Sequence, residues 1–321
     1  MKRHLATLLL AFTAASPVAA QTELRAWNIH PEGYPVTVAL ESFAESVAQL
    51  TGGRYRVKVH SNAVLGDQPK AVQMLKAGEL DIAEFGLTPL AEAAPAAKVL
   101  TLPFVFRQSE HMFKLLDGKL GAQFETKLEA AGYVVLGWYD GGARHFYCAN
   151  KIVKHASDFN GLRVRVQQSE TAIEMVKLLG ATPVVLPYKE VLDGFRTGRI
   201  DCAENNLPSY ESAGHMAAAK HVYLSSHTVA PEALVMSVHS WKKLSEADRK
   251  VFREAGKASA QKMRQLWTAR VEQARQAAIK QGSDFAPMRD YGPLVTKMRP
   301  MHDRYFADPV TREELFTILS N

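Results

Sequence analysis

The sequence predicts an α/β protein of two lobes joined by a hinge, with a long helix near the C-terminus that spans both lobes. The chain has 321 residues, too many for one comfortable core and suitable for two lobes of about 100 to 200 residues each. Strand-like and helix-like segments alternate along it. In addition, "GELDIAEFGL" at residues 78–87 is closely matched by "GRIDCAENNL" at residues 198–207, as expected when two lobes repeat one arrangement.

The N-terminus has the pattern of a secretory signal peptide. A basic start at residues 2–4 precedes an apolar run over residues 5–15, and the small residues at 18–20 offer a cleavage point. That run is shorter than the roughly 20 apolar residues that span a membrane, and no later segment approaches this length. We therefore expect residues 1–20 to be removed and the mature chain to be exported in soluble form.

The composition is that of an ordinary soluble protein, with 47% hydrophobic and 22% charged residues. Without Lys2 and Arg3, 37 basic residues face 33 acidic ones, a net charge of about +4 spread along the chain. No basic patch indicates a nucleic-acid partner. The two cysteines, Cys148 and Cys202, are no disulfide framework. They fall on neighbouring predicted strands, so they could form one disulfide bridge or remain as two buried thiols.

The first lobe is predicted to begin β-α-β-α-β. The segment "GGRYRVKVH" alternates as a strand does, and a helix opens at Asp67 and ends at Gly78. This order implies parallel strands with helices on both faces. The expected strands cover residues 24–30, 52–60 and 79–85, and the expected helices cover residues 35–50 and 67–78.

The second lobe is predicted to repeat this alternation of strands and helices. Ser169 is expected to cap a helix over residues 170–179, and a shorter helix over 188–197 ends at Gly198. The expected strands cover residues 143–149, 162–167, 182–186 and 200–205. Asp81 and Asp201, which occur at matching places in the repeat, are interpreted as structural caps of the turns that follow.

A long helix is predicted after the strand "PEALVMS", which returns to the first lobe. Ser245 and Asp248 resemble a capping box, and the helix runs to about residue 281, roughly 55 Å at 1.5 Å per residue. A helix of that length would span both lobes. We place the first lobe at residues 21–141 plus 231–268 and the second at 142–230 plus 269–321.

Enzyme motifs are absent from the sequence. It contains no Gly-x-Ser-x-Gly, Walker loop, His-Glu-x-x-His or Gly-x-Gly-x-x-Gly. His215 and His221 are six residues apart, a poor spacing for zinc on one helical face. We therefore predict a binding protein with no catalytic residue, no metal and no cofactor.

Arginines on a buried strand indicate an acidic ligand. Arg163 and Arg165 share one face of the strand "LRVRVQ", with Gln167 beyond them. A parallel strand is usually buried on both faces, so such arginines need partners, and a planar guanidinium binds carboxylate in bidentate fashion. We expect Arg163 to pair with a structural acid. Arg144, exposed by the two glycines before it, is a further candidate.

Several ordered motifs together resemble one family. They are "YDGGARHFYCANKIV", "DFNGLRVRVQQS", "LGATPVVLPYKEV", "GRIDCAENNLPSYES" and "PEALVMS". With them, the chain from "WNIHPEGYP" to about residue 281 is similar to the solute-binding proteins of tripartite ATP-independent periplasmic (TRAP) transporters, of the DctP type. The resemblance implies the two-lobed periplasmic-binding-protein architecture and a periplasmic receptor that delivers an organic acid to the small and large permease subunits. With no heptad seam, we expect a monomer.

The resemblance also implies a binding site. Arg165 would meet the ligand carboxylate, Arg144 would be the second basic contact, and Tyr188 would pack an aromatic ring against the ligand. In open α/β sheets, ligands bind at the carboxyl ends of the strands. The two asparagines that follow the glutamate of the second repeat are therefore further candidates. The complete set of expected ligand-binding residues is Arg165, Arg144, Asn205, Glu84, His30, Gln68, Tyr188, Asn206 and Gln167.

The expected ligand is a monocarboxylate, a sugar acid such as a hexuronate. "WNIHPEGYP", "RVQQS" and "AENNLPSYES" are similar to hexuronate-binding members, although Glu84 and Phe85 replace the arginine and asparagine common there. An added carboxylate would accept hydrogen bonds from sugar hydroxyls and repel a second acid group. Two alternatives stay open: an enzyme acting on a sugar acid with Glu84 or Glu204 as base, and a sensory protein that presents its closed form to a receptor kinase.

Overall fold

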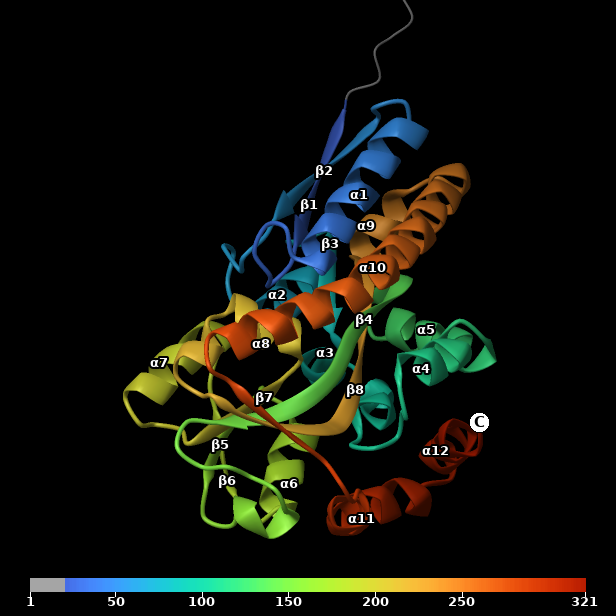
Figure 1. Cartoon of the computed structure of the whole chain (residues 1–321). Helices are drawn as coiled ribbons and strands as arrows, with labels where there is room; N and C mark the ends of the chain where they lie inside the picture. The colour runs from blue at the N-terminus through green and yellow to red at the C-terminus, as the bar shows by residue number, and fades with distance from the viewer. Residues whose placement is uncertain (1–20) are drawn as a thin grey trace, which may run out of the picture.

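The computed structural model describes residues 21–321, so the signal peptide predicted over residues 1–20 lies outside the described residues. Its strands form one nine-stranded sheet in the order β2-β1-β3-β8-β4-β7-β5-β6, with β9 paired to β8. Figure 1 shows β1 and β2 at one end of the molecule and β5 and β6 at the other. The strands are β1 (Thr22–Trp27), β2 (Tyr55–His60), β3 (Ile82–Gly86), β4 (Tyr133–Cys148), β5 (Arg163–Val166), β6 (Thr182–Val185), β7 (Cys202–Asn205), β8 (His221–Ser237) and β9 (Asp284–Pro287).

Each lobe contains the parallel ladder that the sequence predicts. In the first lobe β1 pairs in parallel with β2 and β3, and in the second β5 pairs in parallel with β6 and β7. The chain reaches β2, β3, β6 and β7 through α-helices, which are the usual connection between parallel strands. The predicted repeat is therefore a repeat of fold as well as of sequence.

Two long antiparallel strands, β4 and β8, join the lobes. The sequence predicted only their ends, residues 143–149 and 231–237. The lobe boundaries placed at 141/142 and 230/231 fall inside these strands. At the first of them the β4–β8 register shifts between Asp140 and Ala143, and Gly142 has a φ of +68°. Such a bulge bends a strand, so the crossing is a bent pair of strands and not a flexible linker.

The long helix is α10 (Glu246–Lys280), which crosses both lobes (Figure 1). The hydroxyl of Ser245 accepts a hydrogen bond from the Asp248 N–H, as predicted. Phe252 and Trp267 belong to the core of the first lobe, whereas Ala274 and Ala278 belong to that of the second. A Cβ on Gly256 would lie 2.3 Å from the Leu136 carbonyl oxygen. That glycine therefore lets α10 pack directly on β4.

The remaining helices of the described chain lie around the sheet (Figure 1). They are α1 (Pro35–Leu50), α2 (Gln68–Ala77), α3 (Leu87–Ala93), α4 (Ser109–Leu116), α5 (Lys119–Ala130), α6 (Glu170–Leu178), α7 (Val191–Arg196), α8 (Leu207–Ser212), α9 (Val238–Lys243), α11 (Gly292–Ala307) and α12 (Pro309–Ser320). Ser169 does occupy the N-cap of α6, but its side chain makes no capping bond. The helix predicted over 188–197 is a 3-10 turn, Tyr188–Glu190, followed by α7.

The C-terminal helix α12 packs against the first lobe, although residues 269–321 were assigned to the second. Glu314 of α12 forms an ion pair with Lys127 of α5. Nε2 of His111 in α4 lies 3.1 Å from the carbonyl oxygen of Ile318, which accepts its hydrogen bond. No local pattern in the sequence indicates this return, because the two contacts join residues 187 and 207 positions apart.

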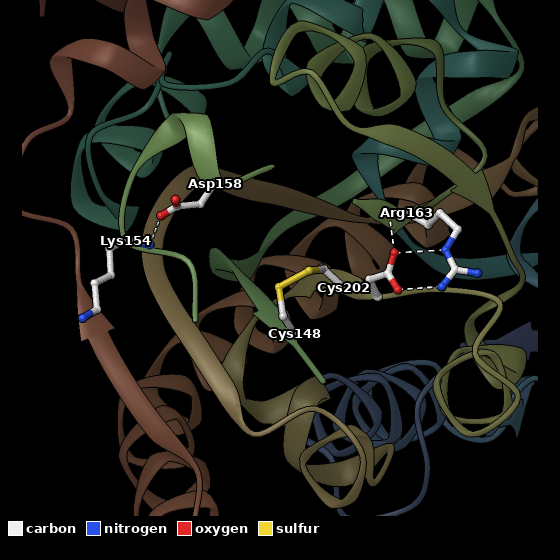
Figure 2. Close-up of a disulfide and its surroundings, with 6 residues drawn as sticks. Cys148, Lys154, Asp158, Arg163 and Cys202 are labelled. Carbon is white, nitrogen blue, oxygen red and sulfur yellow. Dashed lines mark hydrogen bonds and ion pairs between the residues drawn. A yellow bond between two sulfur atoms is a disulfide. The ribbon is translucent and has the colours of Figure 1, made fainter. Parts of the chain in front are cut away.

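The repeated aspartates and the cysteines both have structural roles. Asp81 accepts a hydrogen bond from the Arg25 N–H, and Asp201 accepts one from the Arg163 N–H, so each aspartate fastens its strand to the parallel neighbour. Asp201 also pairs with the Arg163 side chain, which confirms the predicted acid partner of Arg163. Beside this pair a disulfide joins Cys148 to Cys202 (Figure 2). It links directly opposed residues of β4 and β7.

Candidate ligand-binding site

A cavity that is partly open to solvent lies between the two lobes. Eight of the nine predicted ligand-binding residues line it, and the exception is Glu84. The eight are His30, Gln68, Arg144, Arg165, Gln167, Tyr188, Asn205 and Asn206. They come from strand ends and helix starts of both lobes, as the repeat predicts.

Arg165 is a buried cation without an acidic partner in residues 21–321. It lies on β5 with 2% of its surface exposed. Its Nε and Nη2 donate to the Leu186 carbonyl oxygen at 3.0 and 2.7 Å. Burial lowers the pKa of Arg165, yet a guanidinium remains protonated in proteins. An anion in the cavity would balance this charge, and a carboxylate matches its geometry.

Arg144 differs from Arg165 because its charge is already matched. Its Nε and Nη2 donate to the two carboxylate oxygens of Glu204 at 2.6 and 2.8 Å. Burial alone would raise the pKa of Glu204, but Arg144 and His227 lower it to about 2. Arg144 lines the cavity, but Glu204 already neutralises its positive charge. Like Arg163, Arg144 therefore pairs with a structural acid.

The two asparagines after β7 have different roles. Asn206 is the N-cap of α8: its Oδ1 accepts from the Ser209 N–H at 2.8 Å, and its Nδ2 donates to the Gly141 carbonyl at 2.8 Å. Asn205 Oδ1 accepts from Arg144 at 2.8 Å. No residue in the described part of the chain accepts from Asn205 Nδ2, so this amide can donate to a ligand.

An aromatic wall closes one side of the cavity. The rings of His30 and Tyr34 stack at 3.9 Å, and Tyr188 meets His30 edge-on at 6.1 Å. Burial lowers the pKa of His30 to about 3, so its imidazole is neutral near pH 7. Tyr34 also connects the lobes, since its hydroxyl lies 3.0 Å from Ser209 Oγ. The first lobe adds Gln68 at the start of α2, where Asp67 caps the helix as predicted.

Sequence reasoning missed Glu232, which lines the cavity together with Asp67, the N-cap of α2. Glu84, the acid that it proposed, is buried on β3 with 1% exposed and lies behind the wall. Glu232 lies on β8 opposite Gly86. The available signal in the sequence was a single acid inside the apolar run "VAPEALVM". A charged residue on a buried strand is unusual, so it indicates a specific role.

The described residues contain no candidate cluster of metal ligands and no helix suited to cross a membrane. No group of three or more His, Cys, Asp or Glu side chains in residues 21–321 is placed to hold a metal ion. No helix in the same residues combines the length and apolarity that crossing a bilayer needs.

The family model of DctP, described as bacterial extracellular solute-binding protein, family 7, matches residues 28–308. The chain belongs to the DctP family. A solute-binding protein from Chromohalobacter salexigens is 38% identical over 309 residues, which are 96% of this chain and 92% of that relative. DctP membership confirms the predicted class, a solute-binding protein and not an enzyme.

Solved DctP-like structures match the whole fold. A TRAP periplasmic solute-binding protein from Roseobacter denitrificans, with bound β-D-glucuronate, has a TM-score of 0.92 at 37% identity, covering 94% of this chain and all (100%) of its own. One from Sulfitobacter sp. NAS-14.1, with bound β-D-galacturonate, has a TM-score of 0.91 at 35% identity with coverages of 94% and 100%. These matches confirm the predicted two-lobed architecture.

Proposed function

We propose that this chain is the receptor of a TRAP transporter for a sugar monocarboxylate, a hexuronate such as glucuronate or galacturonate. The observation that carries the proposal is Arg165, a buried guanidinium in the interlobe cavity without an acid partner among residues 21–321. The ligand carboxylate would supply that partner. Two similar proteins, at 35% and 37% identity, hold β-D-galacturonate and β-D-glucuronate respectively.

The remaining cavity groups suit a hydroxylated ligand. Gln68, Gln167 and Asn205 offer amides, and Glu232 offers an acceptor. Each buried hydroxyl of a sugar acid needs a hydrogen-bond partner, while the rings of His30 and Tyr188 cover its less polar face. The cleaved leader would place this receptor in the periplasm, where it would deliver its ligand to the permease subunits.

Calorimetric titration with glucuronate, galacturonate, erythronate and succinate would test the proposal. Wild-type protein should bind at least one hexuronate. Arg165→Ala should weaken that binding by about a hundredfold or more, because it leaves a buried ligand carboxylate unpaired. Arg163→Ala is the matched control, since Arg163 lies on the same strand and pairs with Asp201 at the surface. Unchanged affinity in Arg165→Ala would refute the carboxylate site.

A further inference from the structure

Glu84 and Glu232 form a buried pair of acids at the cavity wall. Strands β3 and β8 are antiparallel, and Glu232 lies opposite Gly86. Glu84, two residues before Gly86, therefore projects from the same face as a diagonal neighbour of Glu232. Only Glu232 lines the cavity. The two side chains are 1% and 8% exposed respectively, so Glu232 is the outer member of the pair and Glu84 the inner one.

The pair has too few partners for two negative charges. Both carboxyl oxygens of Glu84 and Oε2 of Glu232 are buried without any hydrogen-bond partner in residues 21–321. The charged and titratable groups that act on the pair are Asp140, Tyr139 and Arg144 of β4 and Tyr34 before α1. Arg144, the cation among them, is neutralised by Glu204 of β7. Two adjacent carboxyls in such a site cannot both ionise easily.

One proton between the two carboxyls would pair one oxygen of Glu84 with Oε2 of Glu232. A protonated Glu84 has a hydroxyl to donate, and Glu232 has an unused acceptor beside it. In agreement, burial and the neighbouring Glu232 raise the pKa of Glu84 well above its usual value. Burial raises the pKa of Glu232 to about 7. Glu84 is therefore the member that keeps the proton, and Glu232 is the member that ionises near neutral pH.

Glycines leave room beside the outer carboxyl. An ideal Cβ on Gly141 would lie 3.0 Å from Glu232 Oε1, and one on Gly86 would lie 4.0 Å from the same oxygen. A side chain at Gly141 would therefore crowd that oxygen. Because Gly86 and Gly141 have no side chains, Oε1 of Glu232 can face the cavity.

We propose that Glu84 and Glu232 share a single proton and that Glu232 is a specificity-determining residue, accepting hydrogen bonds from ligand hydroxyls and repelling a second carboxylate. The inference rests on the proposed function and names its substrate class more narrowly. The receptor selects sugar acids with one carboxylate over diacids with the same carbon chain. Arg165 binds the charged end of the ligand, and the acid pair requires the other end to be neutral.

The test compares galacturonate with galactarate, which has the same carbon chain and a second carboxylate. Both ligands are titrated at pH 8 and pH 5.5, where their carboxylates remain ionised. Wild type should prefer galacturonate strongly at pH 8, and the preference should shrink by about tenfold at pH 5.5 as Glu232 is protonated. Glu232→Gln should reduce the preference at pH 8 by a similar factor, mainly through better galactarate binding, and should abolish its pH dependence.

Glu84→Gln is the second variant, because its amide still donates to Glu232 but carries no titrating proton. It should retain the preference for galacturonate at pH 8 and lose as much of it at pH 5.5 as wild type does, because Glu84 is neutral at both pH values and Glu232 still titrates. The inference would be overturned if the wild-type preference for galacturonate were the same at both pH values, or if folded Glu232→Gln kept the wild-type preference. Either result would leave the proposed function intact, provided that the protein still binds a hexuronate through Arg165. Loss of that dependence would instead overturn the proposed function.

Discussion

Arg144 and Glu204 form a bidentate ion pair inside the protein, with the Arg144 side chain 9% and the Glu204 side chain 3% exposed. The Arg144 guanidinium also donates to the Glu204 carbonyl and to Asn205 Oδ1. This pair therefore links β4 to the end of β7 next to the cavity. It leaves Arg165 as the cation that a bound anion can neutralise.

Breaking this pair should destabilise the fold. Glu204→Gln leaves the Arg144 charge buried without its counter-ion, which costs about 3 to 5 kcal/mol in comparable sites. Urea denaturation would measure the loss. The double variant Arg144→Met/Glu204→Leu should recover much of it, because an apolar pair removes both charges together. If Glu204→Gln were as stable as wild type, the pair would have no structural role.

Local features could be predicted from the sequence, and contacts between distant segments could not. The Asp67 cap, the Gly78 stop and the start of α10 depend on residues a few positions apart, and the structure has all three. The parallel ladders followed from helices between strands. In contrast, the pairing of β4 with β8 joins segments about 90 residues apart. An apolar run such as residues 133–138 does not specify its partner.

The same limit applies to the binding site, where contacts between distant segments could not be predicted. The strand period placed Arg165 and Gln167 on one face, and the ends of the repeated segments supplied Asn205 and Asn206. Which acid meets which base depends on register between distant strands. Residue types alone therefore could not assign Glu204 to Arg144, nor could they show that Glu232 stands between Glu84 and the cavity.

The disulfide should stabilise the fold without affecting the ligand. Cys148 and Cys202 are 54 residues apart, and closing such a loop in the unfolded chain is worth about 4 kcal/mol in the chain-entropy model. Neither cysteine lines the cavity. The Cys148→Ser/Cys202→Ser variant should therefore unfold at lower urea concentration, as should reduced wild type, while both keep the wild-type Kd. A large change in Kd would mean that the bridge positions the site.

Buried neutral histidines should weaken the fold in acid. Burial, with a smaller contribution from the charge of Arg165, lowers the pKa of His215 to about 3. An unfolded histidine titrates near 6.5. Its contribution to stability is therefore complete above about pH 6.5 and is lost as the pH falls toward 3, because only the unfolded state takes up the proton.

His215→Gln isolates this effect from that of Glu84 and Glu232, whose raised pKa values act in the opposite direction over part of this range. Between pH 6 and pH 4, the slope of unfolding free energy against pH should decrease by about 1.4 kcal/mol per pH unit in the variant, equivalent to one proton. Urea denaturation at several pH values gives this slope. Identical slopes in the two proteins would show that His215 is not held neutral.

Tyr34 should favour the closed arrangement of the lobes. It belongs to the predicted first lobe, and its hydroxyl lies 3.0 Å from Ser209 Oγ of the second. Tyr34→Phe removes this contact but keeps the ring that stacks on His30. Since one hydrogen bond contributes about 0.5 to 1.5 kcal/mol, hexuronate affinity should fall about 2- to 10-fold, mainly through faster dissociation.

Tyr55→Phe is the matched control for that change. The Tyr55 hydroxyl donates to Asp248 at 3.3 Å within the predicted first lobe, so its loss can alter stability but connects nothing across the cavity. Stopped-flow dissociation rates should therefore increase in Tyr34→Phe and stay at the wild-type value in Tyr55→Phe. Equal rates in all three proteins would show that the Tyr34 contact does not hold the lobes together, and closure would then depend on the ligand itself bridging Arg165 and the first lobe.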